Sequence, residues 1–268
     1  MYLLYTDETN VDPTNTDFFV YSGIAISASQ AEALSHGISI LRAKHGYKRE
    51  DILKFNTVER PAHIKPDVHK AIKQEVMELA GAHQVKLFAS MILHAVASSP
   101  DEARRKEINR IVFHFNCFLN GEKDVGLVLI DTFTDGQLNT ILKEKFSVGL
   151  KDMPYSKVMP LERILGYHLA TVGSSHFCSL IDIVLGALRF AINARKDGSK
   201  KAVVDQLLSQ ISPLCLRDRS GDVSELALFF SPKTIKVAKY MAEYEALRKL
   251  FVSAGMTPSQ KLSPVRNY

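Results

Sequence analysis

The chain has 268 residues, of which 46% are hydrophobic and 24% are charged, a balance that is typical of a folded globular protein and excludes a disordered one. It contains no run of about 18 apolar residues, the length that a membrane helix needs, and it does not open on a basic stretch, so we expect neither a membrane span nor a secretory signal. The widely spaced cysteines, Cys117, Cys178 and Cys215, predict neither a disulfide framework nor a CxxC zinc pair, and a cytoplasmic location is expected.

The net charge of +5 is unevenly distributed. Residues 189–268 carry 14 Lys and Arg against 7 Asp and Glu. Such an excess favours a polyanionic partner such as nucleic acid, because basic side chains displace counterions from phosphates. A solvated basic surface is an equally good interpretation.

Apolar runs and turn residues predict strands first and interleaved helices later in the chain. Strands are expected at residues 2–6, 18–26, 86–94 and 125–130. Helical periodicity predicts helices at residues 31–44, 67–80, 101–119, 177–193, 201–210 and 232–251. We expect a core over residues 1–195 and a C-terminal helical extension over residues 196–268 that packs on it.

The last predicted helix, from Pro232 to Phe251, has Ser231 as its expected N-cap and carries an apolar stripe. The stripe consists of Val237, Met241, Tyr244, Leu247 and Phe251. We expect it to cover the core or to form a homodimer contact.

Two of the predicted buried strands end in a carboxylate. Asp7 follows the first strand, and Asp131 follows the strand at residues 125–130. Open α/β sheets place their ligand sites at this carboxyl edge. Each aspartate alone could instead cap a turn, but the coincidence of two favours a functional site.

A third acid, Asp182, lies within a predicted helix that is apolar nearly all round. An unpaired carboxylate there would be costly, so we expect it to face a polar cleft. Helical spacing places it on one narrow polar stripe, which consists of Ser179, Asp182, Gly186, Arg189 and Asn193. Gly186 would allow a close approach to the helix, and Arg189 could contact a phosphate. The alternative is a buried structural pair of Asp182 with Arg189.

Clustered carboxylates without a partnering histidine are typical ligands of Mg²⁺ or Mn²⁺. Two such ions can activate water and stabilise the leaving oxygen in phosphodiester hydrolysis. Acidic-cluster nucleases hydrolyse phosphodiester bonds in this way, and the chemistry requires no covalent nucleophile.

Several segments resemble motifs of the domain-of-unknown-function family numbered 3800, whose members have a ribonuclease H-like fold. Thr6-Asp7-Glu8-Thr9 resembles its Asp-Glu-Ser-Gly opening, and Ile52-Leu-Lys54 resembles its Glu-Leu-Lys element. Leu129-Ile-Asp131 resembles its central strand aspartate. Ser175 with Leu180-Ile-Asp182-Ile-Val-Leu-Gly186 resembles its Ser and Leu-Ala-Asp-x-x-x-Gly helix.

The resemblance implies an α/β fold with a ribonuclease H-like mixed sheet flanked by helices, to which this chain adds C-terminal helices. It implies that Asp7, Asp131 and Asp182 hold Mg or Mn as two ions, with Glu8 and Lys54 beside them as further catalytic residues. Ser175 and Arg189 are expected to bind the substrate, either DNA or RNA. A partner protein in a bacterial defence system is a further expectation.

The sequence also departs from the family motifs. Thr9-Asn10 replaces Ser-Gly, Ile52 stands where the family usually has an acid, and Ile181 stands where a small residue is usual. The missing acid supports an alternative function, that of a catalytically inactive module of the same fold that binds nucleic acid or protein.

Three other sequence patterns bear on different kinds of site. His114 and Cys117 have zinc-ligand spacing but no second pair nearby, so zinc is not expected. A haloacid-dehalogenase-type phosphatase needs a second acid two residues after its strand-end aspartate, and Thr9 and Phe133 stand at those positions. A basic stretch could be a solvated surface or a substrate-facing loop, and it consists of Arg42, Lys44, Lys48, Arg49 and Lys54.

Overall fold

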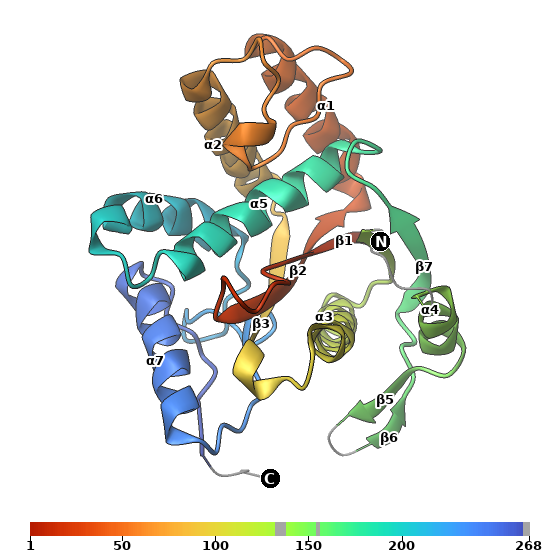
Figure 1. Ribbon diagram of the computed structural model, residues 1–268. Helices are drawn as coiled ribbons and strands as arrows, with labels where there is room; N and C mark the ends of the chain where they lie inside the picture. The colour runs from red at the N-terminus through yellow and green to blue at the C-terminus, as the bar shows by residue number, and fades with distance from the viewer. Residues whose placement is uncertain (132–137, 154–155, 265–268) are drawn as a thin grey trace.

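A computed structural model describes residues 1–131, 138–153 and 156–264, and its centre is a six-stranded mixed sheet (Figure 1). The strand order is β7-β4-β1-β2-β3-β8. The strands are β1 (Tyr2–Thr9), β2 (Phe18–Ser27), β3 (Lys86–Leu93), β4 (Gly126–Asp131), β7 (Ile164–Ala170) and β8 (Leu228–Ser231). A separate antiparallel pair consists of β5 (Leu150–Met153) and β6 (Ser156–Met159).

The register of the sheet determines where the functional side chains lie. β1 runs antiparallel to β2 and parallel to β4, which in turn runs parallel to β7. The last pair between β1 and β4 is Thr6 with Ile130, so the next residues, Asp7 and Asp131, are neighbours near the carboxyl ends of two parallel strands, although β1 continues beyond Asp7 to Thr9. This placement is the one that the apolar runs before each aspartate predict.

The sheet separates two hydrophobic clusters, because successive side chains of a strand point to opposite faces. Along β1, Tyr5 belongs to the cluster beneath α5 (His176–Asn193), and Leu4 belongs to the cluster beneath α3 (Pro100–Glu122). Figure 1 shows these two helices on opposite sides of the strands. Nearly every residue of β2 is buried, as expected of a central strand that is covered on both faces.

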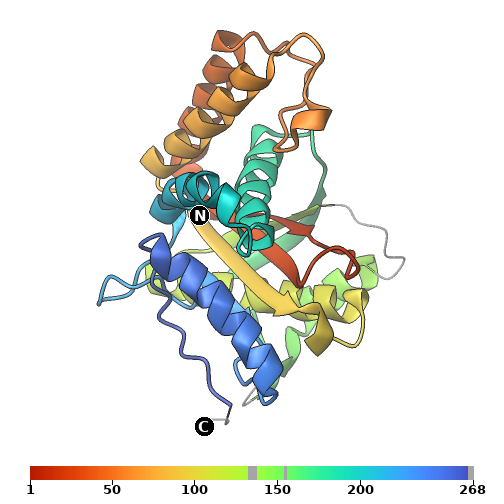
Figure 2. The same ribbon diagram turned by 60° about the vertical axis from the view of Figure 1, so that its left-hand side comes forward.

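A helical arm, residues 28–82, is inserted between β2 and β3. It consists of α1 (Ala28–Lys44) and α2 (Pro66–Ala82), which lie side by side in both views (Figure 1 and Figure 2). Pro66 occupies the start of α2, where its missing N–H leaves no helical hydrogen bond unmade. The connection at residues 45–65 returns to α5 and contributes to the candidate site described below.

The C-terminal part contributes a strand as well as helices. α6 (Lys201–Ile211) packs on α5, and β8 pairs parallel with β3 at the edge of the sheet. The predicted last helix is shorter than expected, because α7 spans Ala238–Ser253. Ser231 ends β8 and hydrogen-bonds Glu107, so it is not the N-cap. Val237 is 50% exposed, whereas Tyr244, Leu247 and Phe251 are buried as predicted.

The mixed sheet flanked by helices and the further C-terminal helices, which the prediction of a ribonuclease H-like fold includes, are confirmed. Elements that the sequence did not predict include α4 (Leu138–Ser147), the strands β5 to β8 and short 3-10 helices at Thr57–Glu59, His94–Val96, Gly198–Lys200 and Ser212–Leu214. Within the described residues one helix, α5, has the length and composition to cross a membrane. Its apolar stretch is 72% buried inside the protein, as in core helices that pass the same test.

Candidate functional site

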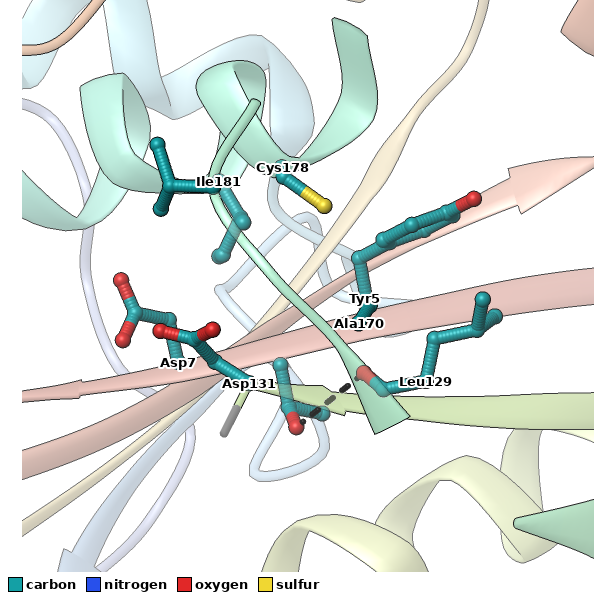
Figure 3. Close-up of a pocket in the computed structure, with 9 residues that line it drawn as sticks. Tyr5, Asp7, Leu129, Asp131, Ala170, Cys178 and Ile181 are labelled. Atoms are coloured by element: carbon teal, nitrogen blue, oxygen red, sulfur yellow. Dashed lines mark hydrogen bonds between the residues drawn. The ribbon is translucent and has the colours of Figure 1, made fainter. Parts of the chain in front are cut away.

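Asp7 and Asp131 lie side by side at the ends of β1 and β4, and their carboxylates point to the face of the sheet that α5 covers (Figure 3). A cavity of about 10 Å³, room for about one water molecule, lies beside them. Cys178 and Ile181 of α5 line this cavity together with both aspartates. The strand-end geometry that the sequence predicts therefore brings two carboxylates together beneath one helix.

The Asp7 carboxyl is strongly perturbed by its position. Its pKa is raised to about 7, mainly by burial and in smaller part by the nearby carboxylates of Asp131, Asp182 and Glu8. The backbone N–H of Glu8 donates to Asp7 Oδ1 at 2.7 Å, and this hydrogen bond lowers the pKa. A cation would stabilise the charged form of Asp7, because it would offset both the burial and the repulsion.

Asp182 is held in place by the arm. The backbone N–H of Phe55 donates to Asp182 Oδ2 at 2.6 Å, although 127 residues separate the two in sequence. Burial raises the pKa of Asp182, while this hydrogen bond and the positive charges of Lys54 and Arg189 lower it. One carboxylate oxygen is thus oriented by the backbone of the arm.

Gly186 allows that contact. A Cβ atom at this position would lie 2.3 Å from Cγ of Phe55, so only glycine admits the ring against α5. The predicted close approach to the helix is therefore made by the chain itself. Lys73 of α2 secures the same residue from the other side, since its Nζ donates to Phe55 O at 2.7 Å and lies 4.5 Å from the centroid of the ring.

Lys54 and Arg189 lie near Asp182 without forming a direct ion pair with it among the described residues. Lys54 pairs with Glu59, and the guanidinium of Arg189 is 3.5 Å from Thr9 Oγ1. The predicted alternative, in which Asp182 is the direct structural partner of Arg189, does not describe this arrangement. Arg189 is half-buried and close enough to act on Asp182 electrostatically.

Glu8 lies on the opposite face of the sheet from Asp7. Its carboxylate accepts hydrogen bonds from Arg104 of α3 at 2.6 and 2.8 Å. Both side chains are largely buried, so the pair links β1 to α3. The structure therefore does not bring Glu8 together with Asp7, Asp131 and Asp182.

The remaining predicted residues lie along the start and the polar stripe of α5. Ser175 is the N-cap of the helix, where its Oγ accepts from the backbone N–H of Phe177 at 3.1 Å. Ser179 is buried, and Asn193 exchanges two hydrogen bonds with Asn10 of the β1–β2 connection. The predicted stripe thus faces the arm and the end of β1.

The carboxylate oxygens of this site are the kind of ligand that a hard divalent cation prefers. The number of side chains that supply them is smaller than predicted. Asp7 and Asp131 supply adjacent carboxylate oxygens, which are the ligands that Mg²⁺ and Mn²⁺ prefer. Within residues 1–131, 138–153 and 156–264, no three His, Cys, Asp or Glu side chains lie close enough to hold a metal ion. Asp182 is therefore a neighbour of the aspartate pair rather than a third member of a closed cluster.

Three residues around Asp182 were not singled out as site residues from the sequence. These are Phe55, Lys73 and Glu59, whose carboxylate raises the pKa of Asp182. Phe55 acts through its backbone, so no side-chain pattern could have identified it. Lys73 on the mostly apolar buried face of α2, which also contains His69, is a sequence signal that could have been noticed.

Comparisons with known proteins concern the fold alone. The sequence matches no known family model, and no curated protein matches it. A chain from the complex of PCNA with ribonuclease HII from Archaeoglobus fulgidus is similar with a TM-score of 0.42 and 9% identity, over 100% of this chain and 98% of that one. Bst-ribonuclease HIII in complex with Mn²⁺ gives a TM-score of 0.33 and 13% identity, over 79% of this chain and 61% of that one. A mutant of Bst-ribonuclease HIII gives a TM-score of 0.34 and 12% identity, again over 79% of this chain and 61% of that one.

Proposed function

We propose that this protein is a metal-dependent nuclease that hydrolyses phosphodiester bonds at Asp7 and Asp131, with Asp182 beside them. The observation that carries the proposal is the pair of adjacent aspartates, in which burial and neighbouring carboxylates raise the pKa of Asp7 to about 7. Neighbouring buried carboxylates repel one another when charged, and a bound cation would relieve that repulsion.

The roles of the chain's residues follow from their positions. Asp7 and Asp131 would hold a divalent cation, Mg or Mn, and the bound ion would supply activation of water and stabilisation of the leaving oxygen. Phe55 N–H fixes the orientation of Asp182 toward this region. Lys54 and Arg189 place positive charge near Asp182, where the phosphate of a DNA or RNA substrate would lie.

A second candidate function is a catalytically inactive module of the same fold that binds nucleic acid or protein. Ile52 favours it, because an apolar and 42% exposed side chain stands where the resembled family usually has an acid. The lack of a three-carboxylate cluster among the described residues favours it as well. Such a module would bind its partner stoichiometrically and without turnover.

Cleavage assays distinguish the two functions. We expect the purified protein to cleave labelled DNA, RNA or hybrid oligonucleotides with Mn²⁺ or Mg²⁺ and to stop in EDTA. Asp131→Asn should abolish cleavage, whereas Asp205→Asn, a matched change in a surface pair with Lys201 on α6, should leave it unchanged. Binding without metal-dependent cleavage of any of these substrates would establish the module instead.

A further inference from the structure

A second and much larger hollow, of about 870 Å³, opens between the helical arm and the start of α5. One wall comes from α1 and the connection that follows it, and the other comes from residues 173–179. The lining of the hollow includes Arg42, Lys48, Arg49, Ser174, Ser175 and Ser179. The hollow is therefore polar and partly basic, unlike the small cavity beside Asp7.

The basic stretch of the arm divides into cations with carboxylate partners and cations without. Lys44 pairs with Glu75 on the outer side of the arm, and Lys54 pairs with Glu59. The guanidinium of Arg42 is buried and donates to the backbone carbonyls of residues 48, 49 and 51. Arg42 therefore fixes the course of the connection where it borders the hollow.

Lys48 and Arg49 are the two cations of this stretch that remain available. Both are exposed, both line the hollow, and neither has a carboxylate partner within the part of the chain that the structure describes. The nearby Asp51 is already engaged, because it accepts from Lys48 N–H at 2.6 Å and pairs with His63 at 3.1 Å. The exposed Glu50 is the other acid in the lining.

The opposite wall offers hydrogen-bond donors. Ser175 and Ser179 line it, and the first turn of α5 begins there, whereas the hydroxyl of Ser174 already donates to Thr171 O at 2.6 Å. Hydroxyls and the backbone N–H groups of a helix start are common partners of phosphate oxygens. Basic side chains thus face neutral donors across one hollow.

The hollow and the small cavity beside Asp7 are lined by neighbouring residues of the turn that leads into α5. Ser174, which lines the hollow, is 3.7 Å from Cys178, which lines the cavity beside Asp7. In the same way Gly173 borders the hollow, and its neighbour Val172 borders the cavity. A chain molecule lying in the hollow would therefore be close to the aspartate pair.

We propose that this hollow binds the sugar-phosphate backbone of a polynucleotide strand, with Lys48 and Arg49 contacting successive phosphates. The part of the inference that places the scissile phosphate of that strand at Asp7 and Asp131 rests on the proposed nuclease function. Binding in the hollow does not rest on it, since Lys48 and Arg49 need no metal ion to contact phosphates.

Fluorescence anisotropy with a labelled single-stranded oligonucleotide in EDTA tests the binding. The double variant Lys48→Ala/Arg49→Ala should bind at least about tenfold more weakly at low salt. Its slope of log K against log salt should be shallower by about 1.4, or about 0.7 for each lost phosphate contact. Lys236→Ala/Lys239→Ala removes the same charge from exposed residues of the C-terminal part and should change affinity less than about twofold. Lys48→Arg/Arg49→Lys should retain binding.

Four outcomes decide the inference. Equal weakening in both alanine pairs would overturn it, because that result reports net charge alone. Competition by inorganic phosphate or a mononucleotide as effective as that by the unlabelled strand would also overturn it, since the hollow would then hold a small ligand. Loss of binding in a protein that never cleaves would support the hollow while the nuclease function fails. Metal-dependent cleavage with an unchanged KM in Lys48→Ala/Arg49→Ala would support the nuclease function and overturn the binding of the strand in the hollow.

Discussion

The two faces of the sheet treat buried carboxylates in opposite ways. On the α3 face, Glu8 is paired with Arg104, and the fully buried Glu107 accepts from the hydroxyls of Ser90 and Ser231. On the α5 face, Asp7, one residue away from Glu8, has its pKa raised mainly by burial, and its carboxylate neighbours Asp131 and Asp182 add to the rise. Carboxylates of the first kind connect elements of the fold, whereas those of the second kind destabilise it and are expected where a cation binds.

The largest expected effect comes from the α3 face. Arg104→Leu leaves Glu8 buried without its partner and should lower the free energy of unfolding by about 3–5 kcal/mol. Urea denaturation measures this loss. The double variant Glu8→Leu/Arg104→Leu should recover much of it, because no charge is then stranded. A single variant as stable as the wild type would show that the pair does not support the fold.

The next substitution, Asp7→Asn, is expected to stabilise the protein. Asp7→Asn should raise the free energy of unfolding of the metal-free protein at pH 8, by up to about 4 kcal/mol, because it removes a buried charge. Folding raises the pKa of Asp7 from 3.8 to about 7, so the folded wild type binds more protons and loses stability as the pH rises through this window. The advantage of the variant should therefore vanish below pH 3.8 and be complete above 7. Denaturation series at several pH values test it, and a constant difference would contradict the account.

A smaller effect is expected where the arm meets α5. Gly186→Ala places a methyl group into the Phe55 ring and should cost about 1–3 kcal/mol, and it should also reduce cleavage because it displaces the N–H that orients Asp182. Gly121→Ala on α3 is the matched control, since nothing lies within 4 Å of its added Cβ. That change should be neutral or stabilising by up to about 1 kcal/mol. Equal thermal melts of the two variants would contradict the packing described here.

The smallest effect on stability is expected for Asp182→Asn. The Asn side chain keeps an oxygen that can accept from Phe55 N–H, so melting should change little, while metal-dependent cleavage should be lost. Arg189→Ala should instead raise KM with a smaller change in kcat. A drop of several kcal/mol in Asp182→Asn would mean that this carboxylate is structural.

The positions of the aspartates could be predicted from the sequence, because each follows a short apolar run that is typical of a buried strand. The alternation of side chains along a strand could also have separated Glu8 from Asp7, since adjacent residues point to opposite faces. The Phe55 N–H could not be predicted, because it depends on the path of a long connection and on a backbone group.

The edge strands β7 and β8 could not be predicted from the sequence for a different reason. β7 contains Gly166 and His168 and is only half-buried, so it lacks the continuous apolar run of β1 or β4. β8 has four residues, too few for a period to be recognised, and the helical pattern expected after it was extended backwards to Pro232. Short or exposed strands acquire their pairing from the sheet they join rather than from their own sequence.

Thermal melting with and without Mn²⁺ tests the central claim, that the Asp7 and Asp131 pair holds a divalent cation, most directly. We expect Mn²⁺ to raise the Tm of the wild type at pH 8 and to have no effect on Asp7→Asn or Asp131→Asn, although Asp7→Asn should melt higher than the wild type without metal. Asp205→Asn should respond as the wild type does. A wild type that does not respond to Mn²⁺, or an Asp7→Asn variant that responds equally, would contradict the account.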